Sequence, residues 1–487
     1  MAGISSIGIG SNLELGTLLD KLSAAERLPL DALQKQHTAY QTKLTSYGTV
    51  KSVLSSFQAA AKALANLDTF GAVKAQVGNA DVLGVTTGTN AVPGNLTVNV
   101  TRLAQAQSLA GAGQARQDVA IGTGTLTFDF GTTTGYDDNP VSPTYGTYVN
   151  PAFNATAGAS KTVTIDGSNN TLQGIRDAIN KANIGVKASI INDGSGTPYR
   201  LVLNAEKTGE AMSMRITGSS PELQALAGYD PVAGPQPGGM KETIRATNAA
   251  LTVNGIAITS GTNAVADAAQ GVTMTLKKTG STSLSLTQDT DSIKTAIQSM
   301  VTAYNNIQTT ARQLTSFDTK AGTKAALNGD SVLRGIQSSL RAVLNTPETG
   351  GAANAPSMLA QIGVSLQKDG TMAIDNKKLD AALKDNLRDV ARLMAGDGAT
   401  GGFARRLSNA VDRVTGTKGP LGAATDGLEK SMKDLEKRYD ATSLRIESTI
   451  ERYRTQFTQL DLLVGRMNQT RSYLTQQFAA LTGTSKQ

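Results

Sequence analysis

Both ends of the chain repeat apolar residues every three or four positions, the spacing that lines one face of an α-helix. Near the N-terminus, Ser11 and Asn12 precede a stripe that begins at Leu15, and we expect a capped helix that Pro29 interrupts. A second helix follows and keeps the stripe, without proline, as far as Leu67. It is too long and too narrowly striped to be a simple core helix.

The C-terminal region repeats the pattern from Leu428 to Leu481, with polar residues in the seam at Thr442 and Arg471. A narrow seam of this kind is typical of coiled coils, because the turns of one helix cannot bury it. We therefore expect the two terminal stripes to pack on each other or on copies of the same chain. Two seams of this length favour assembly with other chains over packing within one chain.

Between the helical ends, apolar and polar residues alternate, which predicts β-strands. Leu251–Val253 and Ile256–Ile258 flank Asn254-Gly255, the dipeptide typical of a two-residue hairpin turn. Further strands are predicted at Leu96–Val100, Val272–Leu276 and Ser283–Leu286. We interpret residues 71–118 and 245–288 as one β-domain in two pieces, interrupted by an insertion.

The insertion begins with low-complexity sequence rich in glycine, threonine and proline, for which we expect loops with short strands. A more regular unit follows, with a strand, a helix and two strands predicted at Thr162–Ile165, Thr171–Asn183, Val186–Ile191 and Tyr199–Leu203. Asp291–Leu314 and Leu379–Met394 return to helix. The fold class is therefore α+β multi-domain, with long coiled-coil-like helices from both termini and discontinuous antiparallel β-rich domains between them.

The 487 residues include no cysteine, no tryptophan and a single histidine, His37. Thiolate metal sites, thiol nucleophiles and disulfides are excluded, which argues against a conventional hydrolase or metalloenzyme. No stretch is apolar for long enough to span a membrane, and the N-terminus has no Sec-type signal pattern. The absence of cysteine also suits a chain that is exported unfolded.

The net charge of +7 comes mainly from residues 291–425, where basic residues are interleaved with aspartates. No basic block or arm forms a phosphate footprint, so we expect no nucleic-acid binding.

Four groups of residues are candidates for chemistry. Gly8-Ile9-Gly10 lacks the preceding strand and the third glycine of a dinucleotide fingerprint, and Asp137-Asp138 lies in a Gly/Pro/Thr-rich loop that favours solvated acids. Tyr136, Tyr145 and Tyr148 are best interpreted as the core of a small domain, with a sugar- or protein-binding surface as the alternative. His37 falls on the seam of the second helix. We expect no catalytic, cofactor or metal site.

Motifs along the chain resemble the bacterial flagellar filament cap, the hook-associated protein 2 family. They include Glu26-Arg27-Leu28-Pro29-Leu30, Val253-Asn254-Gly255, Asp289-Thr290-Asp291-Ser292-Ile293-Lys294, Lys368-Asp369-Gly370-Thr371-Met372 and Ser472-Tyr473-Leu474-Thr475-Gln476-Gln477-Phe478. These motifs are collinear and spread over about three quarters of the chain. The unit Leu172–Leu203 also resembles a module shared with flagellins.

The resemblance implies a homo-oligomer, most often a pentamer, at the filament tip, with helical legs from both termini and an outward plate of β-domains. It implies secretion by the flagellar type III export apparatus, guidance of flagellin into the filament, retention of exported flagellin, and a position beside neighbouring hook-associated proteins. We expect a leg domain (1–35 with 445–487), a helical body (36–70 with 289–444), a β-domain (71–118 with 245–288) and an outer α+β domain (119–244).

The resemblance also implies roles for the leg residues. Flagellin and assembly contacts of the N-terminal leg fall on Leu13, Leu15, Leu18, Leu22, Leu30 and Leu33. Contacts of the C-terminal leg with an export chaperone, and later with the filament, fall on Tyr453, Phe457, Leu460, Leu463, Met467, Leu474 and Phe478.

Two other classes stay open at this point. One is a secreted adhesin that binds host mucin through residues 119–244. The other is a filament subunit, a flagellin, against which the motifs at residues 26–30 and 472–478 stand. An enzyme is not expected.

Overall fold

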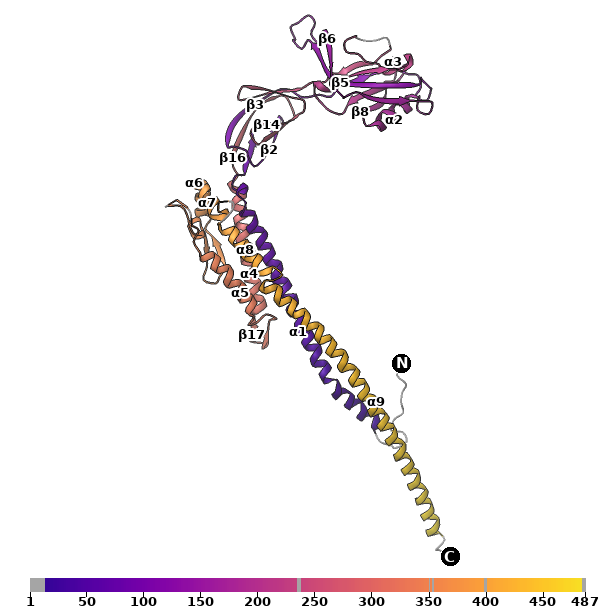
Figure 1. Cartoon of the computed structure of the whole chain (residues 1–487), viewed down its shortest axis with the longest axis vertical. Helices are drawn as coiled ribbons and strands as arrows, with labels where there is room; N and C mark the ends of the chain where they lie inside the picture. Colours follow the sequence, from indigo (N-terminus) through magenta and orange to yellow (C-terminus); the bar gives the residue numbers. More distant parts are fainter. Residues whose placement is uncertain (1–13, 234–237, 350, 353, 398–400, 484–487) are drawn as a thin grey trace. The chain divides into compact units, whose positions relative to one another are not determined.

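The computed structural model describes residues 14–483, apart from 234–237, 350, 353 and 398–400 (Figure 1). The chain divides into two compact units. Unit 1 combines the two ends of the chain, up to Phe70 and from Thr290, and unit 2 is Gly71–Asp289. The predicted Ser11-Asn12 cap lies outside the described residues.

Unit 1 consists mainly of α-helices. The helices are α1 (Leu15–Leu64), α4 (Thr290–Thr315), α5 (Ser331–Asn345), α6 (Asn376–Asp385), α7 (Leu387–Ala395), α8 (Phe403–Thr415) and α9 (Pro420–Gly483). Short 3-10 turns occur at Leu67–Thr69 and Leu359–Ile362, and two small hairpins are formed by β17 (Phe317–Asp318) with β18 (Thr323–Lys324) and by β19 (Val364–Leu366) with β20 (Met372–Ile374).

The prediction of two helices separated at Pro29 is wrong. One helix, α1, runs through Pro29 for 50 residues. Proline removes the hydrogen bond to the carbonyl of Ala25, but both residues are exposed, so water can satisfy that carbonyl. Leu67 also departs from the prediction, because it lies beyond the end of α1 in a 3-10 turn and is exposed.

The prediction of a single helix over Leu379–Met394 is also wrong. The chain forms α6 and α7, which meet at Asn386, where the backbone leaves the helical region (φ −139°, ψ 38°). Each helix buries its own apolar face: Leu379 and Leu383 on α6, and Val390 and Met394 on α7. The periodicity alone does not reveal the break.

The core of unit 1 surrounds the C-terminal half of α1. Residues of the five helices α4 to α8 and of the start of α9 join it in one buried cluster. Phe57 and Tyr304 pack with ring centroids 5.8 Å apart at the centre of this cluster. We call this part of unit 1 the helical body.

A buried carboxylate fastens α1 to α5. The side chain of Asp330 is 4% exposed, accepts a hydrogen bond from the Tyr47 hydroxyl at 2.6 Å and pairs with Lys43 Nζ at 3.0 Å. Asp330 also caps α5 by accepting the Leu333 N–H. Burial alone raises the pKa of Asp330, but the hydrogen bonds from Tyr47 and Leu333 and the charge of Lys43 outweigh it, so the pKa is lowered.

The first part of unit 2 is built from strands of both predicted pieces. One sheet has the order β1 (Val73–Val77), β16 (Gly280–Gln288), β3 (Gly94–Arg102), β12 (Ala249–Val253) and β13 (Ile256–Ser260), and a second has β14 (Ala264–Ala269), β15 (Val272–Leu276) and β2 (Leu83–Thr87). All these strand pairs are antiparallel, and one hydrophobic cluster joins the two sheets. We call this part the inner β-region.

The predicted hairpin at Asn254-Gly255 is confirmed. It connects β12 and β13, and both turn residues have positive φ (49° and 83°). A two-residue turn of this hand needs positive φ at both positions, which asparagine and glycine adopt most readily.

The insertion forms two four-stranded sheets with their own core. One contains β10 (Ser213–Gly218), β5 (Gly124–Tyr136), β6 (Tyr148–Ala155) and β7 (Lys161–Ile165); the other contains β11 (Lys241–Ile244), β4 (Ser108–Ala110), β9 (Tyr199–Ala205) and β8 (Val186–Asn192). Helices α2 (Leu172–Ala182) and α3 (Pro221–Ala227) pack on them. We call this part the outer region.

Two features of the outer region differ from the prediction. The low-complexity sequence expected to form loops contains β5, a strand of 13 residues that buries Leu126, Phe128 and Phe130 between glycines and threonines. Strand β4 pairs with β9 of the insertion, although the boundary was predicted after residue 118. The predicted strand–helix–strand–strand unit, in contrast, is present as β7, α2, β8 and β9.

The Asp330 site predicts a pH-dependent contribution to stability. Removing the Tyr47 hydroxyl (Tyr47→Phe) should lower the free energy of unfolding by roughly 1–3 kcal/mol near neutral pH, because a buried carboxylate loses a donor. Since the folded pKa of Asp330 is depressed, the contribution is present above the unfolded pKa of about 3.9 and is lost as the pH falls through the folded pKa. Urea unfolding followed by helical circular dichroism measures the difference.

The matched control is Tyr40→Phe, on the same helix, whose hydroxyl meets only the exposed Gln36 amide. This variant should change the free energy of unfolding by less than about 0.5 kcal/mol. Equal effects of the two substitutions, or a Tyr47→Phe effect that persists unchanged in acid, would contradict the assignment.

Candidate assembly site

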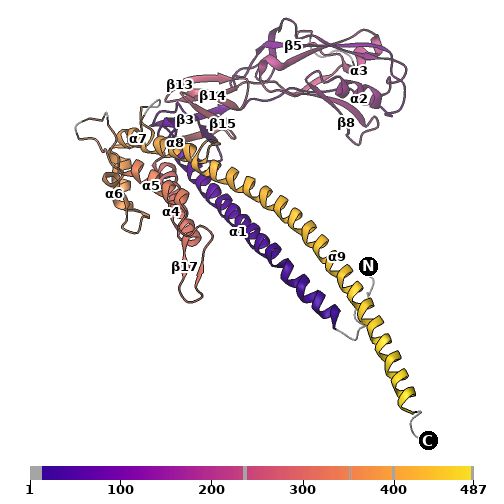
Figure 2. The same ribbon diagram turned by 60° about the horizontal axis from the view of Figure 1, so that its bottom comes forward.

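Helices α1 and α9 lie side by side and run antiparallel (Figure 2). Leu421, at the start of α9, shares the buried cluster with Leu64, at the end of α1. Further down the pair, the Tyr453 hydroxyl lies 3.4 Å from Glu26 Oε1. The two predicted seams therefore pack on each other, which was one of the two arrangements expected.

The predicted N-terminal leg residues fall into three groups. Leu15 is buried, Leu22, Leu30 and Leu33 are half-buried against the helix pair, and Leu18 is exposed. Leu13 lies outside the described residues. Most of this set is therefore at least partly covered by the chain itself.

The predicted C-terminal leg residues become progressively more exposed toward the end of α9. Tyr453 and Phe457 are half-buried, whereas Leu460, Leu463, Met467, Leu474 and Phe478 are exposed, with Met467 at 63% and Phe478 at 64%. Apolar side chains repeated along one helix at such exposure mark an interaction surface. We call the exposed residues from Leu460 to Phe478 the α9 end surface.

The prediction from the resemblance left out two residues of this surface. Leu462 and Tyr473 are as exposed as the predicted members, but they lie off the three-four stripe of the C-terminal helix. Leu19 and Ile446, in contrast, are buried in the seam and position the two helices. The polar exceptions differ, since Thr442 is half-buried and Arg471 is exposed, and the seam residue His37 is half-buried.

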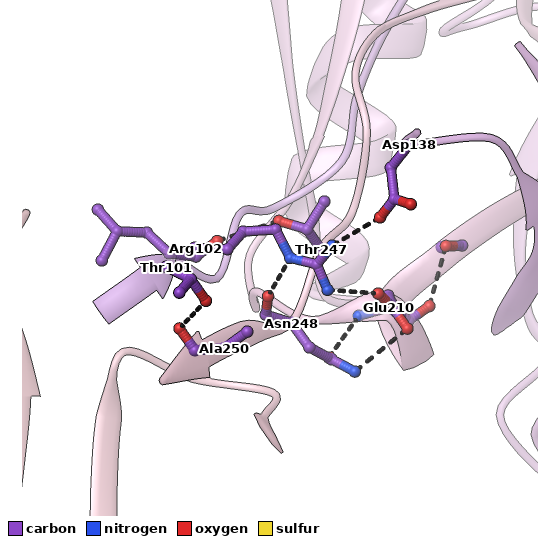
Figure 3. Close-up of polar contacts among 9 residues, drawn as sticks. Thr101, Arg102, Asp138, Glu210, Thr247, Asn248 and Ala250 are labelled. Atoms are coloured by element: carbon purple, nitrogen blue, oxygen red, sulfur yellow. Dashed lines mark hydrogen bonds and ion pairs between the residues drawn. The ribbon is translucent and has the colours of Figure 1, made fainter. Parts of the chain in front are cut away.

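Within unit 2, a polar network joins the inner β-region to the outer region (Figure 3). Arg102, the last residue of β3, donates from Nε to the Asn248 carbonyl at 3.0 Å and pairs with Asp138 at 3.2 Å and Glu210 at 3.5 Å. The Asn248 side chain accepts the Glu210 N–H at 2.9 Å and donates to Glu210 Oε2 at 3.2 Å. One arginine therefore holds three segments that are far apart in sequence.

Neither residue of the Asp137-Asp138 pair is arranged for acid–base chemistry. Asp137 accepts from the Thr144 hydroxyl at 2.6 Å and from the Asn139 N–H, and hydrogen bonds from Ser142, Thr144 and Asn139 lower its pKa. Asp138 pairs with Arg102. Both aspartates therefore organise loops.

None of the three candidate tyrosines belongs to the buried core of the outer region. Tyr136 and Tyr148 are half-buried and pack edge to face, with ring centroids 5.1 Å apart, whereas Tyr145 is exposed. Tyr136 and Tyr148 line a cavity of about 410 Å³ together with Glu242, whose pKa is raised by burial despite the hydrogen bond from Tyr148 at 3.1 Å. Arg245 stacks on Tyr136 at 3.8 Å.

The described residues contain no group of three or more histidine, aspartate or glutamate side chains that could hold a metal ion. Nor does any helix in the described part of the chain have the length and apolarity needed to cross a membrane. Gly8-Ile9-Gly10 lies outside the described residues.

Comparison with known proteins identifies the family. The models for the N-terminus and C-terminus of flagellar hook-associated protein 2 match residues 11–107 and 246–469. Flagellar hook-associated protein 2 of Escherichia coli K12 is 38% identical over 98% of this chain and 98% of its own length. The chain belongs to the flagellar hook-associated protein 2 family.

Other members of the flagellar hook-associated protein 2 family agree with this assignment. The Salmonella typhimurium relative is 36% identical over 99% of both chains. Among solved structures, the D1-D2-D3 domains of the flagellar cap protein FliD from Escherichia coli match with a TM-score of 0.63 and 36% identity, over 79% of this chain and 99% of that chain.

The matched ranges of the hook-associated protein 2 models agree with the strand pairing. The two models leave out residues 108–245, the stretch that begins with β4 and ends after β11. A third model, the flagellin hook IN motif, matches residues 152–207. The predicted resemblance of Leu172–Leu203 to a flagellin module is therefore confirmed.

The Arg102 network predicts that backbone amides between the inner β-region and the outer region are protected from hydrogen exchange. Arg102→Ala should lower the local free energy of opening by about 1 kcal/mol, since its ion pairs are partly exposed. Hydrogen exchange at the Glu210 amide should accelerate about fivefold as Asn248 loses its support. Arg116→Ala, which removes only the exposed pair with Asp118, is the control and should leave that amide unchanged. Unaltered exchange in Arg102→Ala would refute the role.

Proposed function

We propose that this chain caps the distal end of the bacterial flagellar filament, where it promotes flagellin polymerisation and prevents the loss of exported flagellin. The observation that carries the proposal is the match over nearly the whole length to flagellar hook-associated protein 2, together with the fold shared with a flagellar cap protein. The chain acts as a structural protein. The adhesin alternative, with mucin binding through residues 119–244, finds no support in these comparisons.

Self-assembly follows from the same proposal, with the pentamer as the expected stoichiometry. Two observations support contacts between chains: the α9 end surface stays exposed in a single copy, and α9 is 14 residues longer than its partner α1 (64 against 50). The exposed Leu18 lies on α1. In the cap, flagellin and neighbouring hook-associated proteins would cover these residues.

The domain arrangement proposed from the sequence stays part of this proposal. The legs are residues 1–35 with 445–487, the helical body is 36–70 with 289–444, and the inner and outer parts of unit 2 form the outward plate. We place the inner–outer boundary near residues 107 and 245, because β4 and β11 pair within the outer region.

The α9 end surface also suits an export chaperone. A chain secreted through the flagellar type III apparatus must avoid aggregation before export. The exposed apolar side chains of Leu463, Met467 and Leu474 promote aggregation unless a partner covers them. The cysteine-free composition fits passage as an unfolded chain. The same residues would contact the filament after export.

Cap movement during growth requires contacts that can be exchanged. Along the α1–α9 pair the seam contains the half-buried Thr442 and His37, and in the legs Leu22, Leu30, Tyr453 and Phe457 are half-buried. Such a seam packs less tightly than a leucine zipper. We propose that the legs shift against flagellin as each new subunit folds, so that the cap can step around the growing end.

This proposal predicts the effect of charges on the α9 end surface. Met467→Glu combined with Leu474→Glu, supplied to cells that lack the cap protein, should reduce the number of filamented cells at least tenfold, because two apolar contacts of about 1.5–3 kcal/mol each are replaced by charges. Flagellin should accumulate in the medium. Electron microscopy of cells and immunoblotting of culture supernatants measure the two effects.

Gln469→Glu is the matched control, because it adds a charge to an exposed polar position of the same stretch. It should support filament growth like the unmodified chain. Normal filaments with the double variant, or with a chain that lacks residues 450–487, would rule out a role for this leg in capping.

A further inference from the structure

A groove between α5 and α8 lies on the surface of the helical body. It has a volume of about 640 Å³ and is lined on α5 by Ser339, Ala342, Val343 and Thr346 and on α8 by Arg406, Asn409 and Arg413. The α5 wall is made of short side chains, so another helix can approach its backbone closely. Two arginines, and no carboxylate, belong to the lining.

The two arginines form a pair with fixed spacing. They are seven residues apart on α8, which places them on one face about 10 Å apart. Arg413 is exposed and has no ion pair among the described residues. Arg406 pairs with Glu348 at 3.1 Å, while its Nε is buried without a hydrogen-bond partner in the part of the chain that the structure covers. Arg413 therefore offers the groove's unpaired positive charge to a negatively charged partner, whereas Glu348 already balances the charge of Arg406, which also donates to the Thr346 carbonyl at 3.0 Å.

Helix α9 carries a face of matching shape and opposite charge. Asp440 and Glu447 are both exposed, lie seven residues apart, and have no ion pair within the described chain. Leu444 lies between them on the same face. Its side chain is 67% exposed, so the described part of the chain leaves this apolar residue largely uncovered. The opposite side of α9, at Ile446, is buried against α1. We call Asp440, Leu444 and Glu447 the acidic face.

We propose that the acidic face of α9 in one copy docks in the α5–α8 groove of a second copy of this chain. Asp440 would pair with Arg413, Glu447 would lie beside the Arg406–Glu348 pair, and Leu444 would rest on the small residues around Ala342. The charges match in sign and in spacing, and an exposed leucine between two acids fits a groove with short side chains between two arginines.

The contact cannot form within one copy. Leu421 is held in the core of the helical body, and α9 continues unbroken from there, so Asp440 lies about 30 Å further along the helix. A neighbouring copy must therefore be inclined or staggered relative to the first. Since the two surfaces differ, the contact is heterologous and can join copies in succession until a ring closes. The inference rests on the proposed self-assembly and identifies one of its interfaces.

A charge exchange tests the interface with the purified full chain. Arg413→Glu alone and Asp440→Arg alone should each raise the concentration for half-assembly about tenfold, and the combined variant should recover to within about threefold. Lys384→Glu makes the same charge change on α6 and should leave assembly unchanged. Mass photometry over a range of concentrations reads the result.

The absence of cysteine allows a second test that does not depend on charge. A chain with Ala342→Cys mixed with a chain with Leu444→Cys should form a mixed disulfide under mild oxidation, because facing residues come within bonding distance. Lys384→Cys mixed with Leu444→Cys should form far less. Cross-linked dimers are read on non-reducing gels, with the two chains tagged to different sizes.

The outcomes separate the interface from self-assembly in general. A wild-type chain that assembles, with single variants that assemble equally well and no mixed disulfide, overturns the groove interface and leaves the cap proposal standing. A wild-type chain that stays monomeric at every concentration overturns both self-assembly and the groove contact. Tenfold loss, recovery by the exchange and a specific mixed disulfide establish the interface.

Discussion

The narrow apolar seam of the terminal helices is the constraint on which unit 1 depends. A seam of one side chain every three or four residues buries nothing until a second helix covers it, and each covered side chain contributes about 1.5–3 kcal/mol. The chain covers the seam of α1 by pairing α1 with α9, and the helical body encloses the C-terminal half of α1. Because α9 has 64 residues and α1 has 50, the pairing cannot cover the whole of α9.

Burial decreases along α9 toward its C-terminal end, and this gradient separates a rigid part from an adaptable part. Near the body, Leu54 and Phe57 are fully buried and Asp330 locks Lys43 and Tyr47 in place. Further along α9, Ile446 is still buried, Tyr453 and Phe457 are half-buried, and the α9 end surface is exposed. Local opening costs little where few apolar contacts are lost, so such an end suits the exchange of partners that we propose for the leg. The proposed movement of the cap needs this division.

The sequence predicts elements whose signal is local and periodic, and it fails where the deciding contact is distant. The leg seams, the Asn254-Gly255 hairpin and the unit from β7 to β9 follow from spacing alone. Strand β5 was missed because its glycines and threonines dilute the alternation, and the break at Asn386 because both flanking helices keep an apolar face. No local pattern indicates that Arg102 meets Glu210, 108 residues away. The exposure of Leu462 and Tyr473 likewise depends on where α1 begins relative to α9.

The basic excess of the helical body takes on meaning beside the acids of α9. A periodic apolar seam supplies affinity but specifies register weakly, because sliding by one heptad restores nearly the same contacts. Charges at fixed positions remove this degeneracy, since a shifted register places like charges together or leaves them unpaired. In this chain the seam is apolar, whereas exposed charges of both signs, such as Glu436, Lys437 and Asp440, lie on the flank of α9, and the net positive excess lies mainly in residues 291–425. In the proposed interface, affinity and register are therefore assigned to different faces of the same helices.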